Sequence, residues 1–111
     1  MGKTITEKIF SRVTGKDVIA GDIVFPEPEI ITVHDWYVVN FDSALEELGI
    51  SKLYDPDKLI ISTDHEPIAV SLQAAERQKK VRQIVKKYGI KKFFDTGRGG
   101  HGHVFPVEMG L

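Results

Sequence analysis

The chain has 111 residues, a formal net charge of −1 and no cysteine, and 41% of its residues are hydrophobic. This length fits one small domain, residues 1–111. The lack of cysteine excludes disulfides and thiolate metal ligands from this chain, and the near-zero charge gives no reason to expect binding to nucleic acid or anionic lipid. No apolar run is long enough to span a bilayer and the first ten residues lack a signal-peptide core, which predicts a cytoplasmic protein.

The first element expected is a short amphipathic helix over residues 4–15. Its apolar residues recur every four positions and are Ile5, Ile9 and Val13. Thr4 and Glu7 make the pattern of a capping box at its start, and Gly15 is a typical stop. The following residues, 16–29, contain two prolines and are expected to form a loop.

Strands and helices alternate in the rest of the chain. Three short segments rich in β-branched and aromatic residues are predicted to be strands: 30–36, 58–63 and 91–96. Two segments with helical periodicity separate them: 40–50 and 70–90. This alternation predicts an α/β protein with three layers, α/β/α, around a small and mostly parallel sheet.

Polar residues stand at the carboxyl end of each predicted strand. The first ends at His34 and Asp35, the second at Asp64 and His65, and the third at a glycine-rich loop, 97–106. Ligands of parallel α/β sheets bind beyond the carboxyl ends of the strands. The convergence of these three strand ends therefore predicts a ligand site.

Asp64 and His65 have two interpretations. In the functional one, the carboxylate orients and charges the imidazole, which then acts as a general acid. In the structural one, Asp64 caps the turn after the strand and His65 is a bystander. The pattern alone leaves both open.

The loop 97–106 contains four glycines and two histidines, His101 and His103. Glycine amides of this kind can cradle a phosphate or a carboxylate, and Arg98 is either a partner for an anionic ligand or a solvated cation. His-x-His is a frequent pair of metal ligands, but no spaced third ligand accompanies it, so no metal ligand is assigned. The alternative is a glycine-rich turn with solvated imidazoles.

Several motifs, taken in order, carry a resemblance to a known family. They are "GKTITEKI", the His-Asp pair after an apolar strand, "DPDKLIISTDHEP" and "KKFFDTGRGGHGHVFPVEMGL". Together they resemble the N-terminal part of the large subunit of 3-isopropylmalate dehydratase and homoaconitase, in the aconitase superfamily. The resemblance runs from about Lys3 to Leu111 and implies the N-terminal portion of an aconitase-type domain.

The resemblance also implies a function. Members of this family are hydro-lyases that move a hydroxyl group on a di- or tricarboxylic acid by dehydration and rehydration, with a [4Fe–4S] cluster as Lewis acid. Asp64 and His65 match the family's pair that assists the leaving hydroxyl, and His103 matches the histidine of its glycine-rich loop. These three are the expected catalytic residues. The expected substrate contacts are His34, Asp35 and Arg98.

The chain departs from the family at two places. Gly102 and Val104 replace the family's Cys and Gln on either side of His103, and "WYVVNF" replaces the stretch that follows its His-Asp pair. The second change predicts a different hydroxy-acid substrate. His101 stands at an apolar position of the family's loop and is given no catalytic role.

The family's cluster cysteines lie beyond the matched segment. The chain is therefore expected to need the remaining large-subunit polypeptide and a small subunit, and to be inactive alone. One alternative is a stand-alone module that binds a carboxylate or a metal. Another is an interaction protein without a function of its own.

Overall fold

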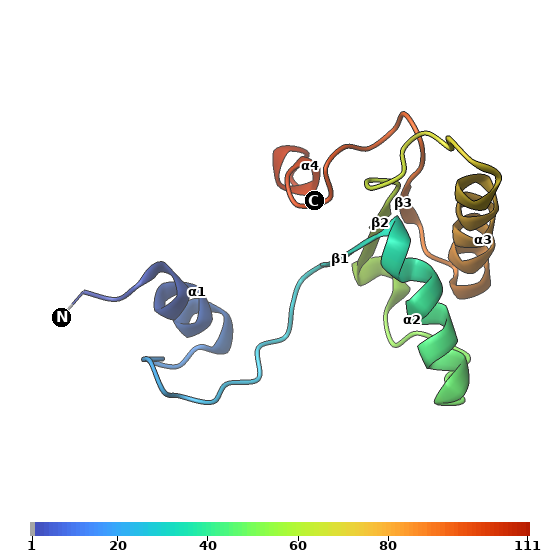
Figure 1. Ribbon diagram of the computed structural model, residues 1–111. Helices are drawn as coiled ribbons and strands as arrows, with labels where there is room; N and C mark the ends of the chain where they lie inside the picture. The colour runs from blue at the N-terminus through green and yellow to red at the C-terminus, as the bar shows by residue number, and fades with distance from the viewer. Residues whose placement is uncertain (1) are drawn as a thin grey trace.

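The computed structural model describes residues 2–111 (Figure 1). In chain order the elements are α1 (Ile5–Thr14), β1 (Ile31–His34), α2 (Asp35–Glu47), a 3₁₀ turn (Pro56–Lys58), β2 (Leu59–Ser62), α3 (Leu72–Tyr88), β3 (Lys92–Phe94) and α4 (Phe105–Glu108). The predicted alternation of strands and helices is confirmed. Within residues 2–111, no helix has both the length and the apolar character needed to cross a membrane.

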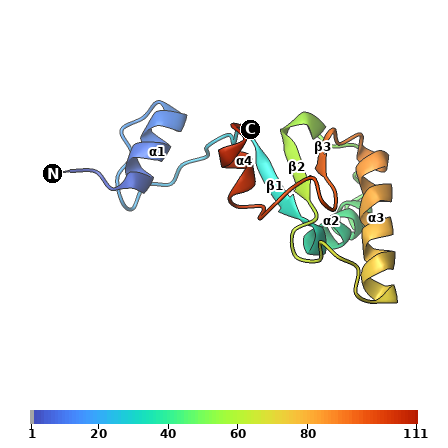
Figure 2. The same ribbon diagram turned by 90° about the horizontal axis from the view of Figure 1, so that it is seen from above.

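The three strands form one parallel sheet in the order β1-β2-β3. Ile31 of β1 pairs with Leu59 of β2, and Ile60 of β2 pairs with Lys92 of β3. Each connection moves one place in the same direction and parallel crossovers are right-handed, so α2 and α3 lie on the same face of the sheet. Figure 2 shows these two helices on one side of the strands.

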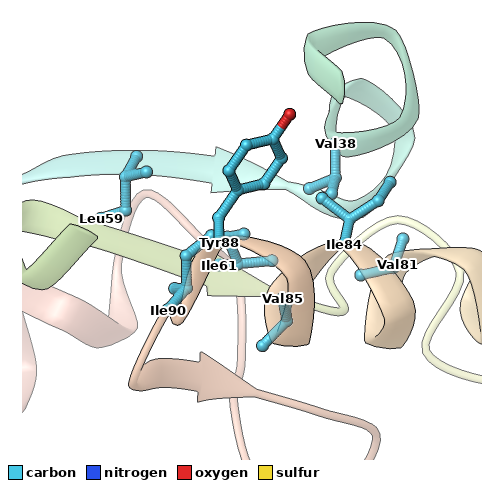
Figure 3. Packing of buried hydrophobic residues seen from close by; sticks show 8 residues of the cluster. All are labelled: Val38, Leu59, Ile61, Val81, Ile84, Val85, Tyr88 and Ile90. Atoms are coloured by element: carbon cyan, nitrogen blue, oxygen red, sulfur yellow. The ribbon is translucent and has the colours of Figure 1, made fainter. Parts of the chain in front are cut away.

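The core lies between these two helices and the central strand. Eight buried residues form it: Val38, Leu59, Ile61, Val81, Ile84, Val85, Tyr88 and Ile90 (Figure 3). Residues two apart on a strand face the same side, which is why Leu59 and Ile61 both point toward the helices. Full burial of one aliphatic side chain of this size contributes about 1.5–3 kcal/mol, so the core holds α2 and α3 on the sheet that carries the strand ends.

The opposite face of the sheet is covered by the C-terminal segment. Ile60, which alternation directs to this face, is 1% exposed. Phe94 of β3 packs edge-to-face on Phe105 of α4 with ring centroids 4.9 Å apart, and Gly99 lies against the Phe94 side chain. The α/β fold class is therefore confirmed. One outer layer is formed by α2 and α3, and the other by the glycine-rich loop with the one-turn helix α4.

The boundary between β1 and α2 comes earlier than the sequence pattern predicts. The strand predicted over 30–36 ends at His34, and the helix predicted over 40–50 begins at Asp35. The residues after Asp35 have high strand propensity, but the helical conformation places Val38 in the core against α3, where it is fully buried. Tertiary packing here overrides local propensity.

The ends of α1 and α3 follow their capping signals. Thr4 and Glu7 form the capping box of α1, and the hydroxyl of Ser71 accepts the backbone N–H of Ala74 at the start of α3, at 3.1 Å. Gly89 ends α3 with φ at 66°, in the left-handed region that glycine adopts without steric cost. These local signals explain why both helices could be predicted from the sequence.

The N-terminal segment leads away from the sheet (Figures 1 and 2). Its helix α1 buries none of its residues. Three apolar side chains of α1 are at least half exposed: Ile5, Ile9 and Val13. Residues 16–29 form the predicted loop. The strand ends and the C-terminal loop lie in the body of the molecule, away from this segment.

Candidate functional site

The carboxyl ends of β1 and β2 bring two histidines into contact. His34 is the last residue of β1, and His65 lies shortly after the end of β2. Their rings stack with centroids 3.9 Å apart and an angle of 19° between the ring planes. Parallel pairing places His34 beside Ser62, so the turn that leaves β2 starts next to it. Two residues that the sequence assigned to one ligand site are therefore neighbours.

Two aromatic residues in the first turn of α2 flank the histidine pair. The ring centroid of Trp36 lies 4.8 Å from that of His65, and the centroid of Tyr37 lies 4.6 Å from that of His34. Both aromatic side chains remain exposed on their other side. Neither was selected as a site residue from the sequence, which placed Trp36 on the predicted strand over 30–36.

Asp35 is buried beneath this pair. Its Oδ1 accepts the backbone N–H of His65 at 3.1 Å, and its Oδ2 accepts the backbone N–H of Glu66 at 3.0 Å. Glu66 is in turn tied to α3: Gln78 donates to its carbonyl oxygen at 2.7 Å, and Arg77 pairs with its carboxylate. Glu66 was not selected from the sequence, although its position next to His65 was a possible signal.

Asp64 connects β2 to the glycine-rich loop. Its Oδ2 accepts the backbone N–H of Gly102 at 2.8 Å and lies 3.7 Å from Nδ1 of His65. The loop approaches closely here, since a Cβ on Gly102 would lie 3.0 Å from the hydroxyl of Ser62 and 3.1 Å from Asp64 Oδ2. Asp64 thus lies beside the imidazole of His65 and bonds to the glycine-rich loop, whereas the cap of the turn after β2 that one interpretation expected is replaced by this bond to Gly102.

The loop carries its histidines into solvent. His101 and His103 are both exposed, with ring centroids 5.2 Å apart. Gly102, which lies between them, joins the loop to the end of β2 through the bond from its backbone N–H to Asp64. Arg98 lies in an exposed part of the loop, where its backbone N–H donates to the carbonyl oxygen of Asp95 at 2.9 Å. The loop therefore carries His103 next to the glycine that contacts the end of β2, and Arg98 lies earlier in the same loop.

Burial lowers the pKa of His34 below its ordinary value of 6.5, and the neighbouring His65 lowers this pKa further. The carboxylates of Asp35 and Asp64 oppose the shift. Among residues 2–111, the buried Nδ1 atom of His34 has no hydrogen-bond partner. These surroundings favour the neutral form of His34, while the side chain of His65 is one-third exposed and open to a ligand.

The donor atoms of His34, Asp35 and His65 lie within 4.8 Å of one another, which is a spacing compatible with a metal ion. The nearly parallel rings, however, direct their nitrogen lone pairs alongside each other rather than toward one point. A shared ion would require one ring to turn. A [4Fe–4S] cluster is held by cysteine thiolates, and since this chain has no cysteine its donors do not fit that group.

No protein-family model matches the chain, but curated relatives match nearly all of it. The 3-isopropylmalate dehydratase large subunit 1 of Methanopyrus kandleri is 41% identical over 97% of this chain. The 3-isopropylmalate dehydratase large subunits of Sulfurovum sp. and Aquifex aeolicus are 40% and 37% identical over 100% of it. The match covers 26% of each of these three relatives, so the chain spans about a quarter of their length.

Proposed function

The chain belongs to the family of 3-isopropylmalate dehydratase large subunits, as its sequence motifs predicted, and we propose that it supplies part of the active site of a hydro-lyase. The proposed substrate is a hydroxy di- or tricarboxylic acid similar to 3-isopropylmalate. Residues 1–111 would act as one unit, together with the remaining large-subunit polypeptide and a small subunit. The proposal is carried by the stacked His34 and His65 at the carboxyl end of a parallel sheet, where Asp64 joins His65 to the loop that contains His103.

The proposed reaction is the elimination of water from the hydroxy acid. The carbon–oxygen bond of the hydroxyl breaks, and the hydroxyl leaves as water after taking a proton. A base removes a proton from the neighbouring carbon, and the electron pair of that C–H bond forms the double bond. His65 is the proposed proton donor to the hydroxyl, because its ring is open to a ligand and Asp64 beside its Nδ1 orients it. The base would belong to polypeptide outside this chain.

The other site residues have binding roles in this proposal. His34, whose lowered pKa favours its neutral form, would bind the substrate through a hydrogen bond. His103 would approach the departing hydroxyl from the loop, and the exposed Arg98 would pair with a substrate carboxylate. Trp36 and Tyr37 lie against the histidine rings, at positions where the family has a different sequence. These two side chains would contact the side chain of the substrate and so determine which hydroxy acid binds.

The cluster that the family implies would be ligated outside this chain, since no thiolate is present here. The isolated chain is accordingly proposed to be inactive. Its own contribution is the arrangement of imidazoles and carboxylates at the strand ends, which can bind the hydroxy acid and transfer a proton to its hydroxyl.

The test is a chimera in which this chain replaces the matching segment of the Sulfurovum large subunit. Assembled anaerobically with the small subunit, the chimera should dehydrate 3-isopropylmalate or a related hydroxy acid, whereas the large subunit without that segment should not. His65→Ala in the chimera should remove the activity. A chimera that assembles with the small subunit but dehydrates no hydroxy di- or tricarboxylic acid would contradict the proposal.

A stand-alone carboxylate-binding module is a second candidate, because the histidine stack forms within this chain without a partner. Calorimetry of the isolated chain with citrate and with 3-isopropylmalate distinguishes the two. Saturable binding together with an inactive chimera would favour the module. An active chimera whose isolated 111-residue segment gives no binding heat would exclude it.

A further inference from the structure

Asp35 is a charged side chain whose partners are backbone amides. It begins α2, is 2% exposed, and is bonded through both carboxylate oxygens to the turn after β2. A carboxylate this buried is costly unless its oxygens are paired, and the two amide bonds satisfy both of them. At 2% exposure, the carboxylate presents almost no surface to a ligand in solution.

These bonds link the two chain segments that carry the stacked histidines. Asp35 follows His34 directly, and its carboxylate holds the backbone of His65, which lies 30 positions later. One side chain therefore fixes the position of both rings. Without these bonds, the turn over residues 64–66 would lose its tie to the end of β1, and the His65 ring could leave His34.

The remaining contacts of this turn do not replace that tie. Gln78 and Arg77 both hold Glu66, but they belong to α3 and fix the turn relative to that helix alone. The Arg77 ion pair is also partly exposed, and pairs of that kind contribute little to stability. Among the hydrogen bonds of this turn within residues 2–111, the two to Asp35 are the ones that join it to the end of β1, where they act together with the ring contacts of His65.

We propose that Asp35 is a positioning residue that sets the stack of His34 and His65, and that it does not contact the substrate. This separates the group that arranges the site from the groups that touch the hydroxy acid. Asp35 would position the two histidine rings whether or not the chain belongs to a hydro-lyase. Only the expected effect of Asp35 on turnover rests on the proposed function.

The test compares the chain with its Asp35→Asn variant by NMR. Asparagine keeps the shape of aspartate, but its NH₂ group would face one of the two amides, donor against donor. We expect amide exchange at His65 and Glu66 to become about tenfold faster or more, as the loss of a charge-assisted hydrogen bond implies. Exchange at Ile61 in β2 should keep its wild-type rate, and the ring-proton shifts of His34 and His65 should move as the stack opens.

Asp42→Asn is the matched control, because Asp42 is another buried aspartate of α2. Its partners are Lys87 and Tyr88, far along the chain from the site. This control should leave exchange at His65 and Glu66, and the ring shifts of His34 and His65, at wild-type values. A similar response in both variants would mean that the effect follows general destabilisation and would overturn the inference.

A second measurement covers the case in which Asp35→Asn does not fold. In the unmodified chain, scalar couplings across the hydrogen bonds should connect the amides of His65 and Glu66 to the carboxyl carbon of Asp35. Absent couplings, or a folded Asp35→Asn variant with wild-type exchange and ring shifts, would overturn the inference. Neither result depends on activity, so an inactive chimera would count against the proposed function alone.

Discussion

Replacing Gly102 by alanine tests how closely the glycine-rich loop packs on the end of β2. The new Cβ would lie 3.0 Å from Ser62 Oγ and 3.1 Å from Asp64 Oδ2, closer than the ordinary contact range that begins at 3.4 Å. Ser62 is 3% exposed and Asp64 is bonded to the loop, so neither side chain can move away freely. Overpacking of this kind costs about 1–3 kcal/mol, and the stiffer unfolded chain of the alanine variant offsets about 0.4–1 kcal/mol.

We therefore expect Gly102→Ala to lower the free energy of unfolding by about 1–2 kcal/mol, which corresponds to a fall in Tm of roughly 5–10 °C. The assay is thermal and urea unfolding followed by circular dichroism, with Gly100→Ala as the control. At Gly100 the nearest atom to the new Cβ is Phe105 Cβ at 3.4 Å, which is an ordinary contact, so this change should leave the free energy of unfolding unchanged or raise it by up to about 1 kcal/mol. Equal stability of the two variants would refute this packing.

A double-mutant cycle measures the part of this effect that belongs to Asp64. Asp64→Ala removes the carboxylate that the new Cβ meets, and it also leaves the N–H of Gly102 without its acceptor. Gly102→Ala should then cost less in the Asp64→Ala chain than in the wild type, by about 0.5–1.5 kcal/mol. If the two changes in the free energy of unfolding simply add, Asp64 does not hold the loop.

Three further expectations concern the core and the histidine pair. Tyr88→Phe removes the hydroxyl that donates to Asp42 at 3.0 Å and should cost about 0.5–1.5 kcal/mol in urea unfolding, and no change would show that this bond is absent. Ile61→Ala should cost about 2–5 kcal/mol, whereas Ile23→Ala, at a side chain 85% exposed, should stay within about 0.5 kcal/mol, and equal losses would contradict the assigned core. Folding lowers the pKa of His34 below its ordinary value of 6.5, so the folded chain binds a proton at His34 less readily than the unfolded chain does. The contribution of neutral His34 to stability is therefore complete above pH 6.5 and is lost as the pH falls through the lowered pKa of the folded chain. The urea midpoint should therefore fall between pH 7.5 and pH 5, and His34→Gln should reduce this dependence; an unchanged dependence would assign it to other groups.

Capping residues in the sequence correctly predicted the helices α1 and α3, because neighbouring residues determine where these helices begin and end. The cap at Thr4 and the stop at Gly89 are set by neighbouring residues, and the helices they bound lie where the sequence placed them. The start of α2 was predicted five positions too late, because a run with strand propensity is held as helix by the burial of Val38. The one-turn helix α4 was not predicted either, since it depends on the packing of Phe105 on Phe94, which is a tertiary contact.

The same distinction applies to the candidate site. Parallel topology was enough to predict that the ends of β1 and β2 would meet, and the structure confirms that meeting. The stack of His34 on His65 and the bond from Gly102 to Asp64 depend on turn geometry that no periodicity encodes. Asp35, expected among the substrate contacts, is buried with both oxygens on amides, which no local pattern indicated. The catalytic roles of Asp64, His65 and His103 and the substrate contacts of His34, Asp35 and Arg98 remain predictions.

The most direct test of the central claim is the dehydratase activity of the chimera with alanine at each loop histidine in turn. His101 and His103 are two residues apart and both exposed, so the variants remove the same group from nearly the same place. We expect His103→Ala to lower kcat by about 10²–10⁴-fold, the usual contribution of a positioned acid or base, and His101→Ala to change it by less than about threefold. Equal losses, or a larger loss for His101→Ala, would contradict the claim that His103 completes the site formed by His34 and His65.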